Sequence, residues 1–138
     1  MKNYLSKWYS WQLAIISGVL IGISYHQINL GILVYIGFIP ILHSWFRNNP
    51  KNNLFSGYIF GITYNLISNY WMATNSGAEF IVVLFSLIAA TLYLSIFWAL
   101  AGFIVGFYKN SSIKILIIPF LIVSLEWIRS FGPLGFAW

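Results

Sequence analysis

The sequence predicts an all-α integral membrane protein, a bundle of about five transmembrane helices with its N-terminus in the cytoplasm. Hydrophobic residues make up 60% of the 138-residue chain and charged residues 7%, whereas an ordinary soluble domain is about 25% charged. Asp, Glu, Lys and Arg are absent between Lys7 and Arg47, between Lys51 and Glu79, and between Glu79 and Lys109. Each of these uncharged runs exceeds the ~20 residues that cross the hydrocarbon core of a bilayer.

The first two helices are predicted from apolar runs that show no strand-like alternation. In lipid such runs form helices, because a helix pairs its own backbone groups. The first helix is predicted over residues 11–25 and the second over residues 32–46, with a polar link and Gly31 between them. Both are short for a full span, as expected of a shallow or tilted hairpin.

The remaining three helices follow in order. The third is predicted over residues 54–72 and ends at a polar link. The fourth, over residues 79–108, is long enough at ~1.5 Å per residue to tilt or to project beyond the bilayer core. The fifth is predicted over residues 113–130, before Gly132 and Pro133 break it. Residues 1–138 are therefore predicted to form a single transmembrane helical domain.

Pairs of glycines at helix-contact spacing occur in three of these helices. They are Gly18 with Gly22, Gly57 with Gly61, and Gly102 with Gly106. Small residues at this spacing let two helix backbones approach closely. We expect them to pack helices of one chain against each other rather than to form a dimer.

The distribution of Lys and Arg predicts the orientation. The N-terminus and the second-to-third and fourth-to-fifth connections carry Lys2, Lys7, Arg47, Lys51, Lys109 and Lys114, whereas the other two connections carry none. Because cytoplasmic loops are enriched in Lys and Arg, the N-terminus is predicted to be cytoplasmic, Trp45 to anchor at the inner interface and Trp138 to lie on the outer side. The basic residues form no patch or stripe, so no nucleic acid partner is expected.

The side chains do not supply a complete catalytic site. The sequence has no Cys and no Asp, and its two carboxylates, Glu79 and Glu126, belong to different segments. Glu79 is expected to be a water-facing acid at a helix N-terminus. His26 and His43 are expected to be interfacial or hydrogen-bonded residues rather than ligands. No phosphate-binding loop or metal-ligand spacing occurs, so no catalytic residue, metal or cofactor is predicted.

Glu126 and Arg129 form the most informative pair, because opposite charges stand three residues apart in a predicted apolar helix. This spacing places them on one helix face. A structural interpretation is an intrahelical ion pair that lowers the cost of a charge in the membrane, with Arg129 reaching towards the interface. A functional interpretation is a polar patch that binds lipid headgroups at the outer leaflet. The residues alone leave both interpretations open.

The end of the sequence also carries a motif. Glu126-Trp127-Ile128-Arg129, followed by Gly135-Phe136-Ala137-Trp138, resembles a signature in the membrane part of bacterial apolipoprotein N-acyltransferases, with Ala137 in place of a proline. Gly37-Phe38-Ile39-Pro40 is similar to the proline region of that family's second helix, and segments 55–71 and 93–100 are similar to its third and fourth helices. The resemblance suggests a substrate-binding or lipid-binding role for Glu126, Trp127, Arg129, Gly135, Phe136 and Trp138.

The resemblance implies a multi-pass protein of the bacterial cytoplasmic (inner) membrane. The family transfers an acyl chain from a phospholipid, the donor, to the N-terminal diacylglyceryl-cysteine of an apolipoprotein, the acceptor. Its members also contain a nitrilase-like domain with a Glu-Lys-Cys catalytic set. The present sequence is therefore predicted to be the membrane platform of such an enzyme, a fragment without the catalytic domain and inactive alone.

The alternative interpretation is a small stand-alone multi-pass transporter, channel or membrane scaffold. A transport site displays polar groups along the bundle interior or breaks its helices at mid-membrane. The predicted helices offer only a few such groups, at Asn65, Ser68, Asn69, Thr91 and Ser95. The resemblance therefore favours the acyltransferase interpretation.

Overall fold

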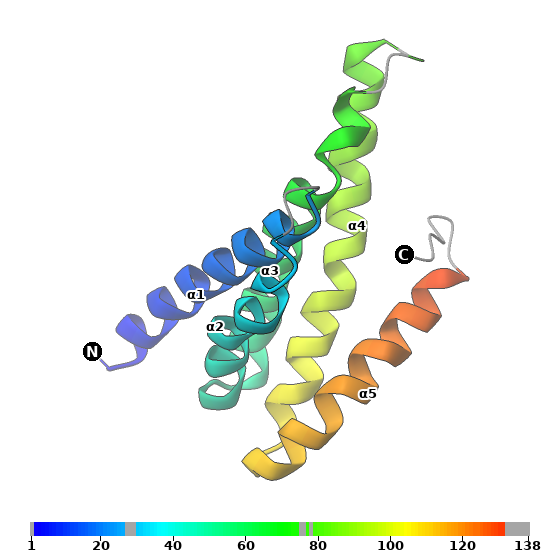
Figure 1. Ribbon diagram of the computed structural model, residues 1–138. Coiled ribbons are helices and arrows are strands. Elements are labelled where there is room, and N and C mark those ends of the chain that lie inside the picture. Colours follow the sequence, from blue (N-terminus) through cyan, green and yellow to red (C-terminus); the bar gives the residue numbers. More distant parts are fainter. Residues whose placement is uncertain (1, 27–29, 75–76, 78, 132–138) are drawn as a thin grey trace.

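The computed structural model describes residues 2–26, 30–74, 77 and 79–131. Within them the chain forms five α-helices and one short 3₁₀ helix and no strand (Figure 1). Their order is α1 (Lys2–Ser24), α2 (Leu33–Arg47), α3 (Pro50–Ser68), η1 (Tyr70–Thr74), α4 (Phe80–Phe107) and α5 (Ser111–Ser130). The predicted all-helical class is confirmed.

Three helices begin earlier than their apolar runs predict. The sequence before residue 11 contains no Gly or Pro to stop α1, which therefore starts at Lys2. Asn49 caps α3, because its side-chain oxygen accepts a hydrogen bond of 2.9 Å from the Asn52 N–H, and Pro50 fills the first position. Asn110 caps α5 in the same way. An apolar run predicts the hydrophobic segment of a helix, whereas the capping residues determine where the helix begins.

Among the described residues, two helices are long and apolar enough to cross a membrane, α4 and α5. The 28 residues of α4 extend about 42 Å at 1.5 Å per residue, which exceeds the ~30 Å hydrocarbon core. In contrast, the 15 residues of α2 extend only about 22 Å. α3 ends at Ser68 and is followed by η1, so the predicted helix over residues 54–72 is divided. The number of spans stays a prediction.

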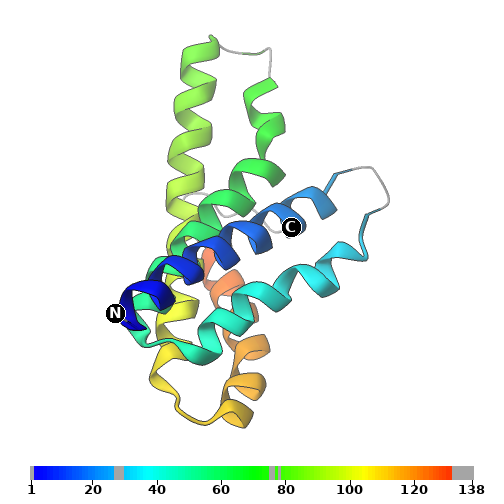
Figure 2. The same ribbon diagram turned by 90° about the vertical axis from the view of Figure 1, so that its left-hand side faces the viewer.

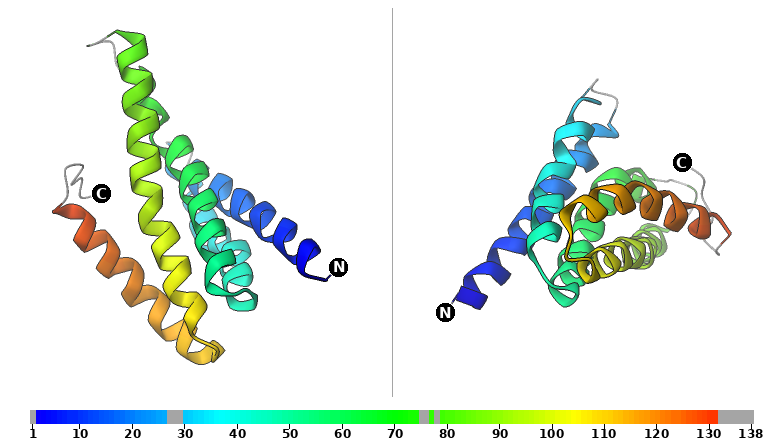
Figure 3. Two further views of the ribbon diagram at one scale, coloured as in Figure 1. Left: turned by 180° about the vertical axis from the view of Figure 1, so that it is seen from behind. Right: turned by 90° about the horizontal axis from the view of Figure 1, so that it is seen from below.

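The helices are organised around α3. This helix packs most extensively on α4 and then on α1, and α2 packs mainly on α1. α5 packs against α4, and the two helices diverge from their shared turn, as seen from the front and from behind (Figures 1 and 3). Most large apolar side chains of α5 are exposed, including Leu116, Phe120 and Val123. The outer face of α5 is therefore suited to contact with lipid or with other apolar helices.

All three glycine pairs lie at contacts within the chain, as predicted. A Cβ on Gly18 or Gly22 of α1 would overlap Thr63 or Ile67 of α3. A Cβ on Gly57 or Gly61 of α3 would overlap the backbone of α4, and one on Gly102 or Gly106 of α4 would overlap the backbone of α3. The α3–α4 contact thus depends on glycines contributed by both helices.

The core is built largely from aromatic rings. Phe60 is fully buried, and its ring lies 4.8 Å from Trp98 and 6.0 Å from Phe38, between ring centroids. Trp45 is also buried, at 1% exposed, so its ring packs inside the bundle, and its predicted depth near the inner interface stays a prediction. Trp45 belongs to the core because α4 approaches it closely: a Cβ on Gly102 would lie 3.0 Å from its ring.

The two basic connections lie at the same end of the bundle (Figures 1 and 2). Lys114, at the start of α5, donates hydrogen bonds to the carbonyls of Trp45 (3.0 Å) and Phe46 (3.1 Å) at the end of α2. Lys114 is buried, at 3% exposed. Its hydrogen bonds therefore link α5 to α2, in addition to its contribution to the positive charge of the connection. Which membrane face this end occupies stays a prediction.

Ser17 of α1 inserts its hydroxyl into the hydrogen-bond ladder of α2. The hydroxyl donates to the Gly37 carbonyl (2.5 Å) and accepts from the Ile41 N–H (2.9 Å). In a regular helix these two backbone groups would bond each other. Pro40, which lies between them, lacks an N–H and its ring crowds the preceding turn. The inserted hydroxyl therefore joins α1 to the proline region of α2.

Ser17→Ala is expected to lower the free energy of unfolding by about 1 to 3 kcal/mol, because buried backbone groups lose their partner. Ser86→Ala is the matched control, since Ser86 is exposed and bonds only its own helix, at the Val82 carbonyl. Denaturant unfolding of the purified chain in detergent measures both changes. Equal stability of the two variants would contradict a joining role for Ser17.

Candidate functional site

The candidate site lies at the end of α5. Glu126 and Arg129 occupy successive turns, and the Arg129 guanidinium donates a hydrogen bond to the Glu126 carboxylate in an ion pair. The two side chains differ in burial: that of Arg129 is 4% exposed and that of Glu126 is 42% exposed. The sequence-predicted pair therefore forms, with its positive member buried and its negative member reaching the surface.

The guanidinium retains a buried donor. Arg129 Nε is inaccessible to solvent and has no hydrogen-bond partner among the described residues. Buried polar groups are normally paired, and a guanidinium carries five N–H donors in a planar fork that matches phosphate oxygens. An oxygen atom of a bound molecule would satisfy this donor.

An aromatic residue of another helix lies near the pair. The Tyr64 hydroxyl of α3 is close enough to Glu126 and Arg129 for their charges to act on it. Tyr25, just after α1, packs edge-on against Tyr64, with 5.6 Å between ring centroids. Nothing in the local sequence around Glu126 indicates these neighbours, because the fold brings them from distant parts of the chain.

A narrow apolar slot leads to the ion pair from between α4 and α5. Its lining residues are Phe97, Trp98 and Ala101 from α4 and Ile122, Leu125 and Glu126 from α5. Glu126 is the charged member of this lining, and Arg129 lies one turn further along α5. The slot holds about 10 Å³, the room of about one water molecule, so an acyl chain would enter it only if α4 and α5 moved apart.

The other predicted site residues do not join this arrangement in the described part of the chain. Trp127 is 65% exposed and packs edge-on against Phe131, with 4.8 Å between ring centroids. Gly135, Phe136 and Trp138 lie outside the described residues. The slot residues Phe97 and Trp98 were not predicted as site residues.

Glu79 and the histidines lie apart from the pair. Glu79 is exposed at the N-cap of α4, as expected. His43 shares a hydrogen bond of 3.2 Å with Arg47, and His26 packs on the Tyr70 ring. Among the described residues, no three His, Cys, Asp or Glu side chains lie together in a way that could hold a metal ion.

Two comparisons with known proteins agree with the sequence motif. Residues 17–138 match the apolipoprotein N-acyltransferase N-terminal domain. The apolipoprotein N-acyltransferase of Geobacter metallireducens is 29% identical over 131 residues, which cover 91% of this chain and 25% of that protein. The chain thus spans about a quarter of the length of this relative. No solved structure matches the chain.

The match to the N-terminal domain covers most of the chain and includes α2 to α5 and the Glu126–Arg129 pair. It extends over the proline region of α2 and both helices that are apolar enough to span a membrane. The chain therefore belongs to the apolipoprotein N-acyltransferase family.

Proposed function

We propose that this chain is the membrane platform of an apolipoprotein N-acyltransferase. The complete enzyme would transfer an acyl chain from a phospholipid to the N-terminal diacylglyceryl-cysteine of an apolipoprotein. The platform would lie in the bacterial inner membrane as a multi-pass bundle with a cytoplasmic N-terminus. Family membership and the two long apolar helices support this proposal.

The observation that carries the proposal is the unpartnered Nε of buried Arg129 beside an apolar slot. When α4 and α5 move apart, one acyl chain would widen the slot between them, and a phosphate oxygen of the donor lipid would accept a charge-assisted hydrogen bond from Arg129. Glu126 would orient the guanidinium through the ion pair. Because Glu126 is partly exposed, its charge remains partly hydrated and competes less strongly with the lipid phosphate.

The contribution of these helices to catalysis would be positioning. The family resemblance implies a thiolate that attacks the phospholipid ester, forming a thioester and releasing a lysophospholipid. The amine of the acceptor then attacks the thioester, which forms an amide and returns the thiolate. The 138 residues contain no Cys, so the thiolate would come from a catalytic domain. Holding the donor ester at a fixed place lowers the entropic cost of its attack.

A chimeric enzyme tests this division of labour. The present residues 17–138 replace the matching segment of the Geobacter metallireducens relative, and acylation of a diacylated lipopeptide is measured. The chimera is expected to form triacylated product, whereas residues 1–138 alone are expected to form none. A chimera that inserts and folds but shows no activity, beside an active parent, would contradict the platform role. Product from residues 1–138 alone would place the chemistry within these helices.

A further inference from the structure

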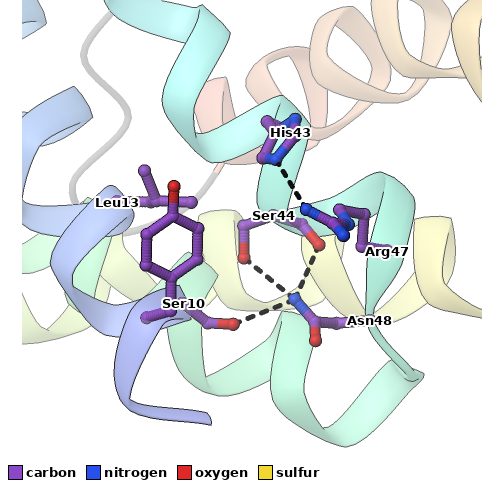
Figure 4. Close-up of a pocket in the computed structure, with 7 residues that line it drawn as sticks. Ser10, Leu13, His43, Ser44, Arg47 and Asn48 are labelled. Carbon is purple, nitrogen blue, oxygen red and sulfur yellow. Dashed lines mark hydrogen bonds between the residues drawn. The ribbon is translucent and has the colours of Figure 1, made fainter. Parts of the chain in front are cut away.

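A second polar site lies at the opposite, basic end of the bundle, between α1 and the end of α2 (Figure 4). It is a hollow of about 540 Å³, and its lining includes Tyr9, Ser10, Leu13, His43, Arg47 and Asn48. The Asn48 amide is fixed by hydrogen bonds to the Ser10 hydroxyl (2.9 Å) and the Ser44 carbonyl (2.8 Å). Its position is therefore set by both helices.

Arg47 provides this hollow with a cation that lacks a nearby acidic partner. The chain has only two carboxylate side chains. Glu126 is paired with Arg129, and Glu79 precedes the start of α4, at the other end of the bundle (Figure 1). The Arg47 guanidinium shares one hydrogen bond with His43, and its fork has five N–H donors. The hollow is thus complementary to an anion.

The C-terminal end of α2 would ordinarily repel an anion, because free carbonyls give a helix C-terminus about half a negative charge. Here side-chain donors from α3, from α5 and from the C-cap of α2 itself cover those carbonyls. Lys114 binds the carbonyls of Trp45 and Phe46, and Asn53 donates to that of Trp45 at 2.9 Å. The Ser44 carbonyl accepts from Asn48. The positive charge of Arg47 is therefore not offset by the helix end that carries it.

The surroundings indicate that the anion belongs to a lipid. Leu13 and the ring of Tyr9 give one side of the hollow an apolar wall. Large apolar side chains remain exposed further along both helices, including Ile16 on α1 and Ile36 and Ile39 on α2. A headgroup in the hollow would place its acyl chains along this surface.

We propose that this hollow binds the phosphodiester headgroup of an anionic phospholipid, at the end of the bundle opposite the Glu126–Arg129 pair. The predicted orientation assigns this lipid to the inner leaflet. It is not the acyl donor, and the proposal does not depend on the acyltransferase function. The bound lipid joins α1 to α2 beside the contacts of Asn48 and Ser17.

Lipid binding to the purified full chain in detergent tests this site. Native mass spectrometry with phosphatidylglycerol gives the dissociation constant, and phosphatidylcholine is the zwitterionic comparison. Arg47→Gln is expected to weaken phosphatidylglycerol binding about tenfold, the value of one charge-assisted hydrogen bond. Lys51→Gln removes the same charge near the same end but outside the hollow, and it is expected to change binding less than about twofold.

Two further variants separate the hollow from general surface charge. Leu13→Trp places a large ring in the apolar wall of the hollow, which narrows it and keeps every charge, so it should weaken phosphatidylglycerol binding. Arg47→Lys keeps the charge but loses the planar fork of donors. Its affinity for phosphatidylglycerol should therefore lie between those of the original chain and Arg47→Gln. Equal losses in Arg47→Gln and Lys51→Gln, or undiminished binding in a folded Leu13→Trp, would overturn the proposal. Displacement of the lipid by millimolar inorganic phosphate would also overturn it, in favour of a soluble phosphate ligand.

Discussion

Gly102→Ala is expected to lower the free energy of unfolding by about 3 kcal/mol, at the upper end of the usual cost of overpacking. The added Cβ would overlap the backbone carbonyl of Asn53 and would lie 3.0 Å from the Trp45 ring. The carbonyl belongs to the backbone of α3 and has no rotamer by which to move away. Helix propensity alone would favour alanine by about 1 kcal/mol. The sign of the effect therefore depends on the close approach of α3 and α4.

Gly31→Ala is the matched control, because a Cβ at Gly31 would meet no atom within 4 Å. Denaturant unfolding of both variants in the same detergent gives the comparison, with Gly31→Ala expected to remain close to the original chain. If Gly102→Ala were as stable as Gly31→Ala, α3 and α4 would not pack as described here.

The helices could be predicted from the sequence because lipid and water impose opposite requirements on side chains. Apolar runs located all five helices, and the long uncharged run after Glu79 corresponds to α4 within one residue at each end. Capping by Asn49 and Asn110, which set the starts of α3 and α5, was not used in that prediction. The burial of Trp45 was not predicted, because neither hydropathy nor the interfacial preference of aromatic rings indicates which tryptophans are covered by other helices.

The site was predictable only to the extent that it is local. Glu126 and Arg129 lie one turn apart, so their pairing follows from helical spacing and is present in the structure. The contributions of Tyr64 and Trp98 depend on how α3, α4 and α5 pack, which the spacing of residues in one helix does not specify. The long-range bond from Lys114 to α2 was missed for the same reason.

Single substitutions of the ion pair are expected to affect stability unequally. In the chimeric enzyme, Glu126→Gln should lower stability by about 3 kcal/mol, because it leaves a buried cation without its partner. Arg129→Gln should lower it by about 1 kcal/mol or less, because the stranded carboxylate is 42% exposed and water screens its charge. Thermal unfolding in detergent gives both values. Equal losses would mean that Arg129 is hydrated in the complete enzyme.

Activity of the same variants, together with Glu126→Gln/Arg129→Gln, separates lipid binding from a purely structural role. The double substitution leaves no unpaired charge, so folding should return towards that of the original chimera. If Arg129 binds the phosphate of the donor, acyl transfer should stay at least about tenfold lower in both variants that lack it, since a charge-assisted hydrogen bond is lost. If the pair only stabilises the helix, the double variant should recover acyl transfer as well as folding. If the double variant recovered both folding and acyl transfer, Arg129 would not bind the lipid. The slot between α4 and α5 would then have no residue to bind the headgroup.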